Sequence, residues 1–168
     1  MLSFINITVA TPVSMAKRVL IFLLCVFAFW TASRAHASES ISIEGFWKGE
    51  KRTLGGKLYL PDNNKGPVPV VVMIHGTAGP GYRYYFHREG LLEAGIATFE
   101  VDFKSGIFSD SRDRPYPQPL IPFAYGALKA LRKNAAVDPK RIGLMGFSFG
   151  GGITVAAMEH VQKLKALG

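Results

Sequence analysis

The sequence has 168 residues, 48% of them hydrophobic, so it can bury one sizeable core and does not belong to the disordered class. The formal net charge is +8, but Lys17, Arg18 and Arg34 lie in the first 37 residues, and without them 17 basic residues stand against 12 acidic ones. The remaining basic residues are scattered, with no cluster interleaved with aromatic side chains, which argues against nucleic-acid binding.

The N-terminal residues have the three-part layout of a secretory signal peptide. A basic pair, Lys17-Arg18, precedes an apolar run of 12 residues that ends at Trp30, and the Ala35-His36-Ala37 pattern follows. This arrangement predicts cleavage after Ala37 and an exported protein, periplasmic or extracellular. Twelve apolar residues are fewer than the ~20 that a membrane-spanning helix needs, so an uncleaved anchor is the weaker alternative. The predicted division is residues 1–37 for the leader and residues 38–168 for one domain.

Two further residues bear on where the leader starts and on the thiol content of the mature chain. Met15 stands directly before the basic pair, so translation from Met15 instead of Met1 is an alternative start. Cys25, the single cysteine, lies inside the apolar run, so the mature chain would contain no thiol and would depend on its core for stability.

The first half of the mature chain predicts a hairpin followed by a buried strand. Strand-like runs over residues 46–52 and 57–60 flank Leu54-Gly55-Gly56, where we expect the hairpin turn. Val68 to Ile74 is a nearly continuous β-branched run, typical of a parallel strand covered on both faces. A helix over residues 84–93 and a strand over residues 96–101 are expected next.

The second half continues the alternation of helices and strands. A long loop over residues 102–117 precedes a helix over residues 119–133, and Asp138-Pro139 marks the break after it. A third buried strand over residues 141–147 and a third helix over residues 153–164 follow. Short alternating units of this kind favour right-handed crossovers and an α/β fold with a doubly wound, mostly parallel sheet.

Gly146-Phe147-Ser148-Phe149-Gly150 fits G-x-S-x-G and stands between an expected strand and an expected helix, the context of a nucleophile elbow. Glycine is needed at positions 146 and 150 because side chains there would collide across so sharp a turn. The turn would also strain the backbone of Ser148 and expose its hydroxyl. We therefore predict Ser148 as the nucleophile and Gly146 and Gly150 as elbow glycines; a Gly-rich turn without function is the alternative.

A second motif, His75-Gly76-Thr77-Ala78-Gly79, follows the first long buried strand. In a fold with a nucleophile elbow, this loop supplies one backbone N–H of the oxyanion hole, and the residue after the nucleophile supplies the other. Thr77 and Phe149 are the predicted donors. His75 is either a catalytic base or a residue that holds the loop by local hydrogen bonds, and the second role is favoured.

From about Gly55 to Leu164 the chain resembles the α/β-hydrolase superfamily and, within it, the dienelactone hydrolase family. The resemblance lies in VPVVVMIHGTAG, GIATFEVDF and DPKRIGLMGFSFGG. It implies hydrolysis of esters or lactones through a nucleophile, a His and an Asp, with no metal and no organic cofactor. The family's namesakes have Cys where this chain has Ser148 and Glu where it has Gly76. These departures favour a general carboxylic-ester hydrolase, acting on a small-molecule ester or lactone.

The rest of the triad has no evident place in the sequence. In this fold the order is Ser, then Asp or Glu, then His, but only 20 residues follow Ser148 and they are expected to form one helix. His87 precedes the nucleophile and His160 lies on the helix that leads away from it. The sequence therefore predicts a C-terminally truncated α/β-hydrolase domain whose His and Asp lie outside it. A non-catalytic remnant or binding module, a peptidase and an acyltransferase remain as alternatives.

An aromatic group follows the glycine-rich loop. Tyr82, Tyr84, Tyr85 and Phe86 could line an acyl pocket, but packing of the first helix is the favoured interpretation. The glycines at 76, 79 and 81 match neither G-x-G-x-x-G nor the P-loop, so nucleotide binding is not expected.

Overall fold

A computed structural model describes residues 14–15, 17–22, 36–62, 64–104, 107 and 120–166, with side chains up to His160. The chain divides into two units, Met1–Ala35 and His36–Gly168. In the first unit, residues 17–22 are helical. Among the described residues, no helix is both long enough and apolar enough to cross a bilayer. The end of the predicted apolar run, including Cys25, and most of the predicted loop over 102–117 lie outside the described residues.

The second unit opens with a long hairpin. Strand β1 (Ser38–Trp47) pairs antiparallel with β2 (Glu50–Tyr59) over ten residue pairs, from Ser38 opposite Tyr59 to Trp47 opposite Glu50. Lys48 and Gly49 form the turn with φ values of 51° and 82°. A two-residue turn with both φ values positive matches the right-handed twist of the strands that it joins.

The hairpin turn differs from the sequence-based expectation, which placed it at Leu54-Gly55-Gly56. These residues lie inside β2 instead. The physical reason at Gly56 is space, because a Cβ built there would overlap the ring of Phe99 on the neighbouring strand β4 (Ala97–Val101). Gly56 therefore marks a close approach between a backbone and an aromatic ring, not a turn.

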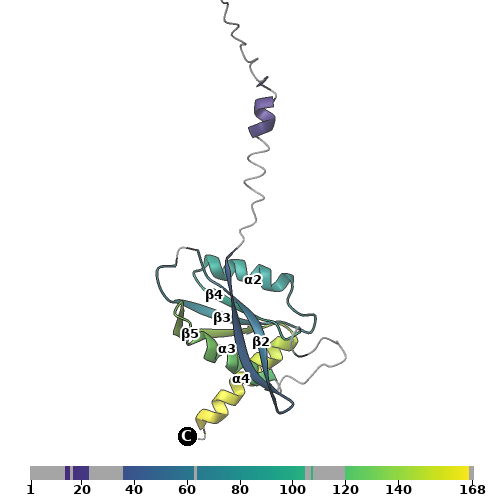
Figure 1. Cartoon of the computed structure of the whole chain (residues 1–168), viewed down its shortest axis with the longest axis vertical. Coiled ribbons are helices and arrows are strands. Elements are labelled where there is room, and N and C mark those ends of the chain that lie inside the picture. The colour runs from purple at the N-terminus through teal and green to yellow at the C-terminus, as the bar shows by residue number, and fades with distance from the viewer. Residues whose placement is uncertain are drawn as a thin grey trace, which may run out of the picture. The chain divides into compact units, whose positions relative to one another are not determined.

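The remaining elements complete a mixed five-stranded sheet with the order β1-β2-β4-β3-β5. β4 pairs antiparallel with β2 and parallel with β3, and β3 pairs parallel with β5. Figure 1 shows helix α2 on one face of the sheet and helices α3 and α4 on the other. The doubly wound α/β fold is thereby confirmed, with its parallel part confined to β4, β3 and β5. The bounds not yet given are β3 Val68–Ile74, α2 Tyr82–Glu93, α3 Ile121–Leu131, β5 Val137–Gly146 and α4 Phe149–Ala166.

The predicted break at Asp138-Pro139 is an irregularity within β5. Val137 pairs with Val68 and Ile142 pairs with Val70, so four residues of β5 lie opposite a single residue of β3. The Asp138 carboxylate accepts the Lys140 N–H at 2.9 Å and the Arg141 side-chain N–H at 2.7 Å, which closes the bulge.

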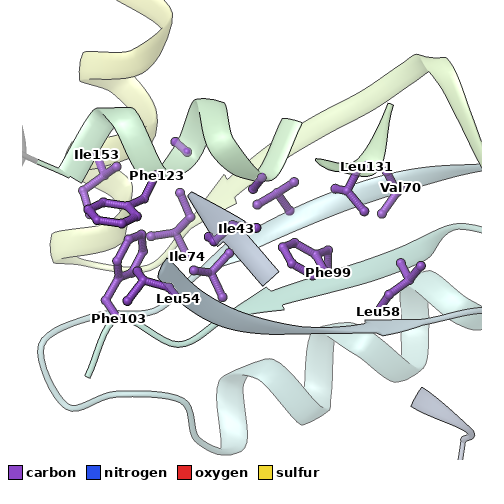
Figure 2. Packing of buried hydrophobic residues seen from close by; sticks show 14 of the residues in the cluster. Ile43, Leu54, Leu58, Val70, Ile74, Phe99, Phe103, Phe123, Leu131 and Ile153 are labelled. Carbon is purple, nitrogen blue, oxygen red and sulfur yellow. The ribbon is translucent and has the colours of Figure 1, made fainter. Parts of the chain in front are cut away.

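The main core lies between the sheet and the pair α3 and α4. Figure 2 shows Phe103, Phe123 and Ile153 meeting at one end of this layer and Leu58, Phe99 and Leu131 at the other. Helix α3 lies very close to β1, because a Cβ on Gly126 would overlap the Glu44 carbonyl oxygen and one on Gly45 would overlap the Phe123 ring. The edge strand β1 of the hairpin is thus closely packed on helix α3 of the helical layer.

Candidate active site

Ser148 occupies a two-residue turn between the end of β5 at Gly146 and the start of α4 at Phe149. Its φ is 52°, and the only other described non-glycine residue with a positive φ is Lys48 in the hairpin turn. An L-residue in this left-handed region costs roughly 1–2 kcal/mol, so the surrounding structure must hold it there. The strand, the strained serine and the helix form the geometry of a nucleophile elbow.

The two glycines that flank Ser148 have no room for a side chain. A Cβ on Gly146 would overlap the Gly150 carbonyl oxygen, and a Cβ on Gly150 would overlap the carbonyl oxygen of Ile74 at the end of β3. The first overlap is within the turn itself, and the second arises because α4 starts directly against β3. The spacing G-x-S-x-G therefore follows from two separate steric limits.

The loop after β3 lies against the elbow. A Cβ on Gly76 would lie 3.1 Å from the Phe147 carbonyl oxygen and 3.3 Å from Ser148 Cβ. The Phe147 N–H donates to the Ile74 carbonyl at 3.0 Å, which ties the end of β5 to the end of β3. The structure therefore brings the predicted loop and the predicted nucleophile together.

The two predicted oxyanion donors flank this contact. Thr77 follows Gly76 in the loop, and Phe149 is the first residue of α4, so its N–H lies at the positive end of the helix dipole. The role of these two N–H groups as oxyanion donors stays a prediction.

His75 is almost fully buried, with 2% of its surface exposed, and both ring nitrogens are used. Nδ1 lies 2.6 Å from the Gly76 carbonyl, and Nε2 accepts the Phe103 N–H at 3.0 Å. These contacts require the neutral tautomer with its proton on Nδ1, so the 3.7 Å approach of Nε2 to Asp102 is not an ion pair. Burial lowers the pKa of His75, which also favours the neutral ring. His75 thus holds the loop after β3 to the segment after β4, and this arrangement does not suit a catalytic base.

The other described histidines make their contacts elsewhere. His87 on α2 packs between the rings of Phe86 and Phe147, with centroid distances of 5.3 and 5.1 Å. His160 on α4 lies against the Tyr125 ring at 6.0 Å. His36, which the sequence placed in the leader, contacts Glu89. None of these contacts involves Ser148.

The aromatic group at the start of α2 has two different environments. Tyr84 is buried, and its hydroxyl donates to the Met73 and Val101 carbonyls at 2.6 and 3.2 Å. Burial raises the pKa of this phenol well above its usual value. The packing interpretation fits Tyr84 alone, because Tyr82, Tyr85 and Phe86 are 76%, 48% and 61% exposed.

One structural partner of the site was not identified from the sequence. The backbone N–H of Phe103 donates to the His75 ring, and Phe103 lies two residues after the end of β4. The available signal was topological: the carboxyl ends of adjacent parallel strands meet at one edge of the sheet, so residues after β4 must approach those after β3.

A family profile named BD-FAE matches residues 57–166, which is more than half of the chain. The chain belongs to the BD-FAE family. The match spans β3, the elbow and α4, so the residues of the candidate site lie inside it. YfhR of Salmonella typhimurium is 30% identical to this BD-FAE chain over 93 residues, which are 55% of this chain and 31% of YfhR. An Escherichia coli protein of 31.7 kDa from the traX-finO intergenic region is 29% identical over 101 residues, which are 59% of this chain and 35% of that protein.

Solved structures confirm that this BD-FAE chain has the α/β-hydrolase fold, as its resemblance to dienelactone hydrolases implied. Est1E from Butyrivibrio proteoclasticus with ferulic acid bound has a TM-score of 0.58 at 22% identity, over 72% of this chain and 48% of Est1E. A dienelactone hydrolase-like promiscuous phosphotriesterase from metagenomic libraries has a TM-score of 0.52 at 22% identity, over 72% and 54% of the two chains. An α/β hydrolase from Penicillium sp. sh18 has a TM-score of 0.57 at 22% identity, over 72% and 41%.

The matched segments cover only part of each comparison protein. The chain spans about a third of the length of the curated relatives it matches and about half of the solved structures.

Proposed function

We propose that this BD-FAE chain carries the nucleophile and the oxyanion loop of a serine hydrolase that acts on carboxylic esters or lactones. The observation that carries the proposal is the strained φ of 52° at Ser148, in a turn pressed against Gly76 of the loop after β3. Structural strain of this kind is retained where it positions a reacting group.

The proposed reaction proceeds through an acyl-enzyme. The Ser148 hydroxyl attacks the substrate carbonyl carbon while a base takes its proton, and the N–H groups of Thr77 and Phe149 bind the resulting oxyanion. Collapse of this intermediate expels the alcohol, and attack by water then releases the acid and regenerates Ser148. We assign the His and Asp of the triad to residues outside these 168, because the described histidines make other contacts.

Two observations support carboxylic esters as the substrate class. Est1E, which shares the fold, binds ferulic acid, a carboxylic acid with an aromatic ring. In this chain Phe147, directly before Ser148, contacts the His87 ring, and Phe86 next to it is 61% exposed. An exposed aromatic ring in a group that reaches the residue before Ser148 suits an apolar acyl or alcohol group. We also propose that the protein is exported, as its leader-like N-terminus suggests.

The test is hydrolysis of p-nitrophenyl acetate by the full-length protein as the native cell produces it. Ser148→Ala should remove nearly all turnover, since loss of the nucleophile costs about 10⁶-fold in a complete serine triad. Ser42→Ala, at an exposed position on β1, is the matched control and should leave turnover unchanged. Equal turnover in parent and Ser148→Ala would overturn the proposed function.

A further inference from the structure

The loop after β3 forms a tight turn over residues 76–79. The Gly79 N–H donates to the Gly76 carbonyl oxygen at 3.0 Å, and the His75 Nδ1–H donates to the same oxygen at 2.6 Å. In a planar trans peptide group the C=O and the N–H point in opposite directions. The Gly76 carbonyl and the Thr77 N–H belong to one such group, so the two donors that fix the carbonyl also fix the direction of the proposed oxyanion donor.

The last peptide group of this turn is held from outside the loop. It consists of the Ala78 C=O and the Gly79 N–H, so the orientation of the carbonyl determines the direction of the N–H that reaches Gly76. The Lys104 ammonium donates to the Ala78 carbonyl at 3.4 Å. The Lys104 stem also lies over Gly79, because a Cβ built on Gly79 would lie 2.8 Å from Lys104 Cδ. Lys104 therefore contacts the turn through both its charge and its aliphatic carbons.

The backbone from which Lys104 extends is itself fixed by hydrogen bonds. The Asp102 N–H donates to the Gly55 carbonyl on β2 at 3.3 Å, and the Asp102 carboxylate accepts the Lys104 N–H at 2.9 Å. Between them, the Phe103 N–H donates to His75 Nε2 at 3.0 Å. The side chain of Lys104 is exposed, but it starts from a segment that is tied to the sheet and to the loop.

We propose that Lys104 is a positioning residue of the candidate active site, which holds the peptide group between Ala78 and Gly79 and thereby directs the Thr77 N–H towards the oxyanion. The inference rests on the proposed function. Lys104 touches no reacting atom in this role. Because the oxyanion forms only in the transition state, loss of the ammonium should slow the reaction more than it weakens binding of the unreacted substrate.

The first experiment compares variants of the full-length protein in the hydrolysis of p-nitrophenyl acetate. Lys104→Met removes the ammonium and keeps an unbranched stem over Gly79, whereas Lys104→Arg keeps a charged donor. Lys129→Met, at an exposed position on α3, is the matched control. The kcat is expressed per active site, counted from the initial burst of p-nitrophenol, so that a fraction of unfolded protein does not affect it.

We expect Lys104→Met to lower kcat by about 3- to 30-fold and to change KM by less than about threefold, since deletion of a whole oxyanion donor costs ~10²–10³-fold in kcat. Lys104→Arg should recover most of the kcat, and Lys129→Met should equal the parent.

The second experiment measures inhibition by phenylboronic acid, which bonds to a serine hydroxyl and presents a negatively charged tetrahedral group to the oxyanion donors. Its Ki should rise in Lys104→Met by about the same factor as kcat falls, because the adduct resembles the transition state. A purely structural role of Lys104 would lower the amount of active protein and leave this Ki unchanged, which would overturn the inference.

Three further results would overturn the positioning role. They are equal kcat values in Lys104→Met and Lys129→Met, an equal loss of kcat in Lys104→Met and Lys104→Arg, and a rise in KM with kcat unchanged. Turnover that persists in Ser148→Ala would instead overturn the proposed function, so the two failures are distinguishable.

Discussion

At the scale of single residues, the backbone of Ser148, the proposed nucleophile, is held in its conformation by its neighbours and not by its own preference. The φ of 52° at Ser148 is unfavourable by roughly 1–2 kcal/mol. Two backbone hydrogen bonds maintain it, from the Gly150 N–H to the Phe147 carbonyl at 2.9 Å and from the Phe147 N–H to the Ile74 carbonyl at 3.0 Å. The strain is therefore offset by contacts that extend from the turn into β3.

His75 should make stability depend on pH. Burial lowers its pKa in the folded state below its unfolded value, so between the two values the unfolded chain binds more protons and stability rises with pH. The contribution of His75 to the free energy of unfolding is complete above pH ~6.5, its pKa in the unfolded chain. As pH falls below that value, this contribution decreases by up to about 1.4 kcal/mol per pH unit. Urea unfolding of the parent and of His75→Gln at pH 7.5 and 5.5 measures it. We expect a smaller loss on acidification in His75→Gln.

Comparison with the variant is needed because the titration of Glu100 changes the stability in the opposite direction as pH falls. Burial on β4 raises the pKa of Glu100, despite its 3.0 Å contact with Arg88, so its folded form binds a proton more readily than the unfolded chain. That contribution increases stability as pH falls and is common to parent and variant. Identical pH dependences in the two proteins would show that His75 is not the responsible group.

The residues of the elbow could be predicted because the steric limit at Gly146 arises within five consecutive residues. The topology brings the segment after β4 towards His75, but the exact partner could not be predicted, since Phe103 lies 28 residues further along the chain and donates a backbone N–H. A backbone donor carries no side-chain signal in the sequence. A motif of consecutive residues can therefore be predicted from the sequence more readily than a contact between two distant loops.

At the scale of elements, three helices and the buried strands lie where the hydrophobic patterns indicated, and the opening hairpin does not. Periodicity identifies an element that buries one face, as in α3, whose buried residues recur at helical spacing. Periodicity does not distinguish a glycine that forms a turn from one that leaves space for a neighbouring side chain. Gly49 makes the turn and Gly56 accommodates the Phe99 ring.

The close packing of α3 on β1 leads to a prediction about helix glycines. Alanine normally stabilises a helix interior by about 0.5–1 kcal/mol relative to glycine. Gly126→Ala should instead destabilise the protein by about 1–3 kcal/mol, because the new Cβ would overlap the Glu44 carbonyl oxygen, which is backbone and cannot swing away.

Gly90→Ala on α2 is the matched control, since no atom lies within 4 Å of the Cβ it would add. It should show the ordinary gain of about 0.5–1 kcal/mol. Both changes are measured by urea unfolding. A gain in stability for Gly126→Ala would mean that α3 can move away from β1 without loss.

At the scale of the whole molecule, the 168 residues bring the proposed nucleophile Ser148 and the proposed oxyanion loop together, but no contact joins a described histidine to Ser148. A serine hydroxyl is a weak nucleophile until a positioned base takes its proton. The 168-residue chain on its own should therefore hydrolyse p-nitrophenyl acetate only slowly, and Ser148→Ala should change its turnover by less than about tenfold. In a complete triad the same change costs about 10⁶-fold.

His87 provides the decisive control for this prediction. Its ring contacts Phe147, the residue directly before Ser148, so it is a candidate for a base that a rearrangement would bring to Ser148. Rapid turnover that is lost in both Ser148→Ala and His87→Ala would show that the 168 residues contain a working base.

The pairing of β3 with β5 also determines when the elbow can form during synthesis. Val70 pairs with Ile142 and Ile74 with Gly146, so the two halves of the candidate site come from distant parts of the chain. A ribosome releases the hairpin, β3, α2 and β4 well before it releases β5, and the pairing of distant segments is intrinsically slow. The loop that contains Gly76 is thus synthesised early, before Phe147 and Ser148, against which it packs, have been made. Ser148 acquires its strained geometry only when β5 docks on β3, so a nascent chain cannot assemble the elbow until β5 and the start of α4 have been translated.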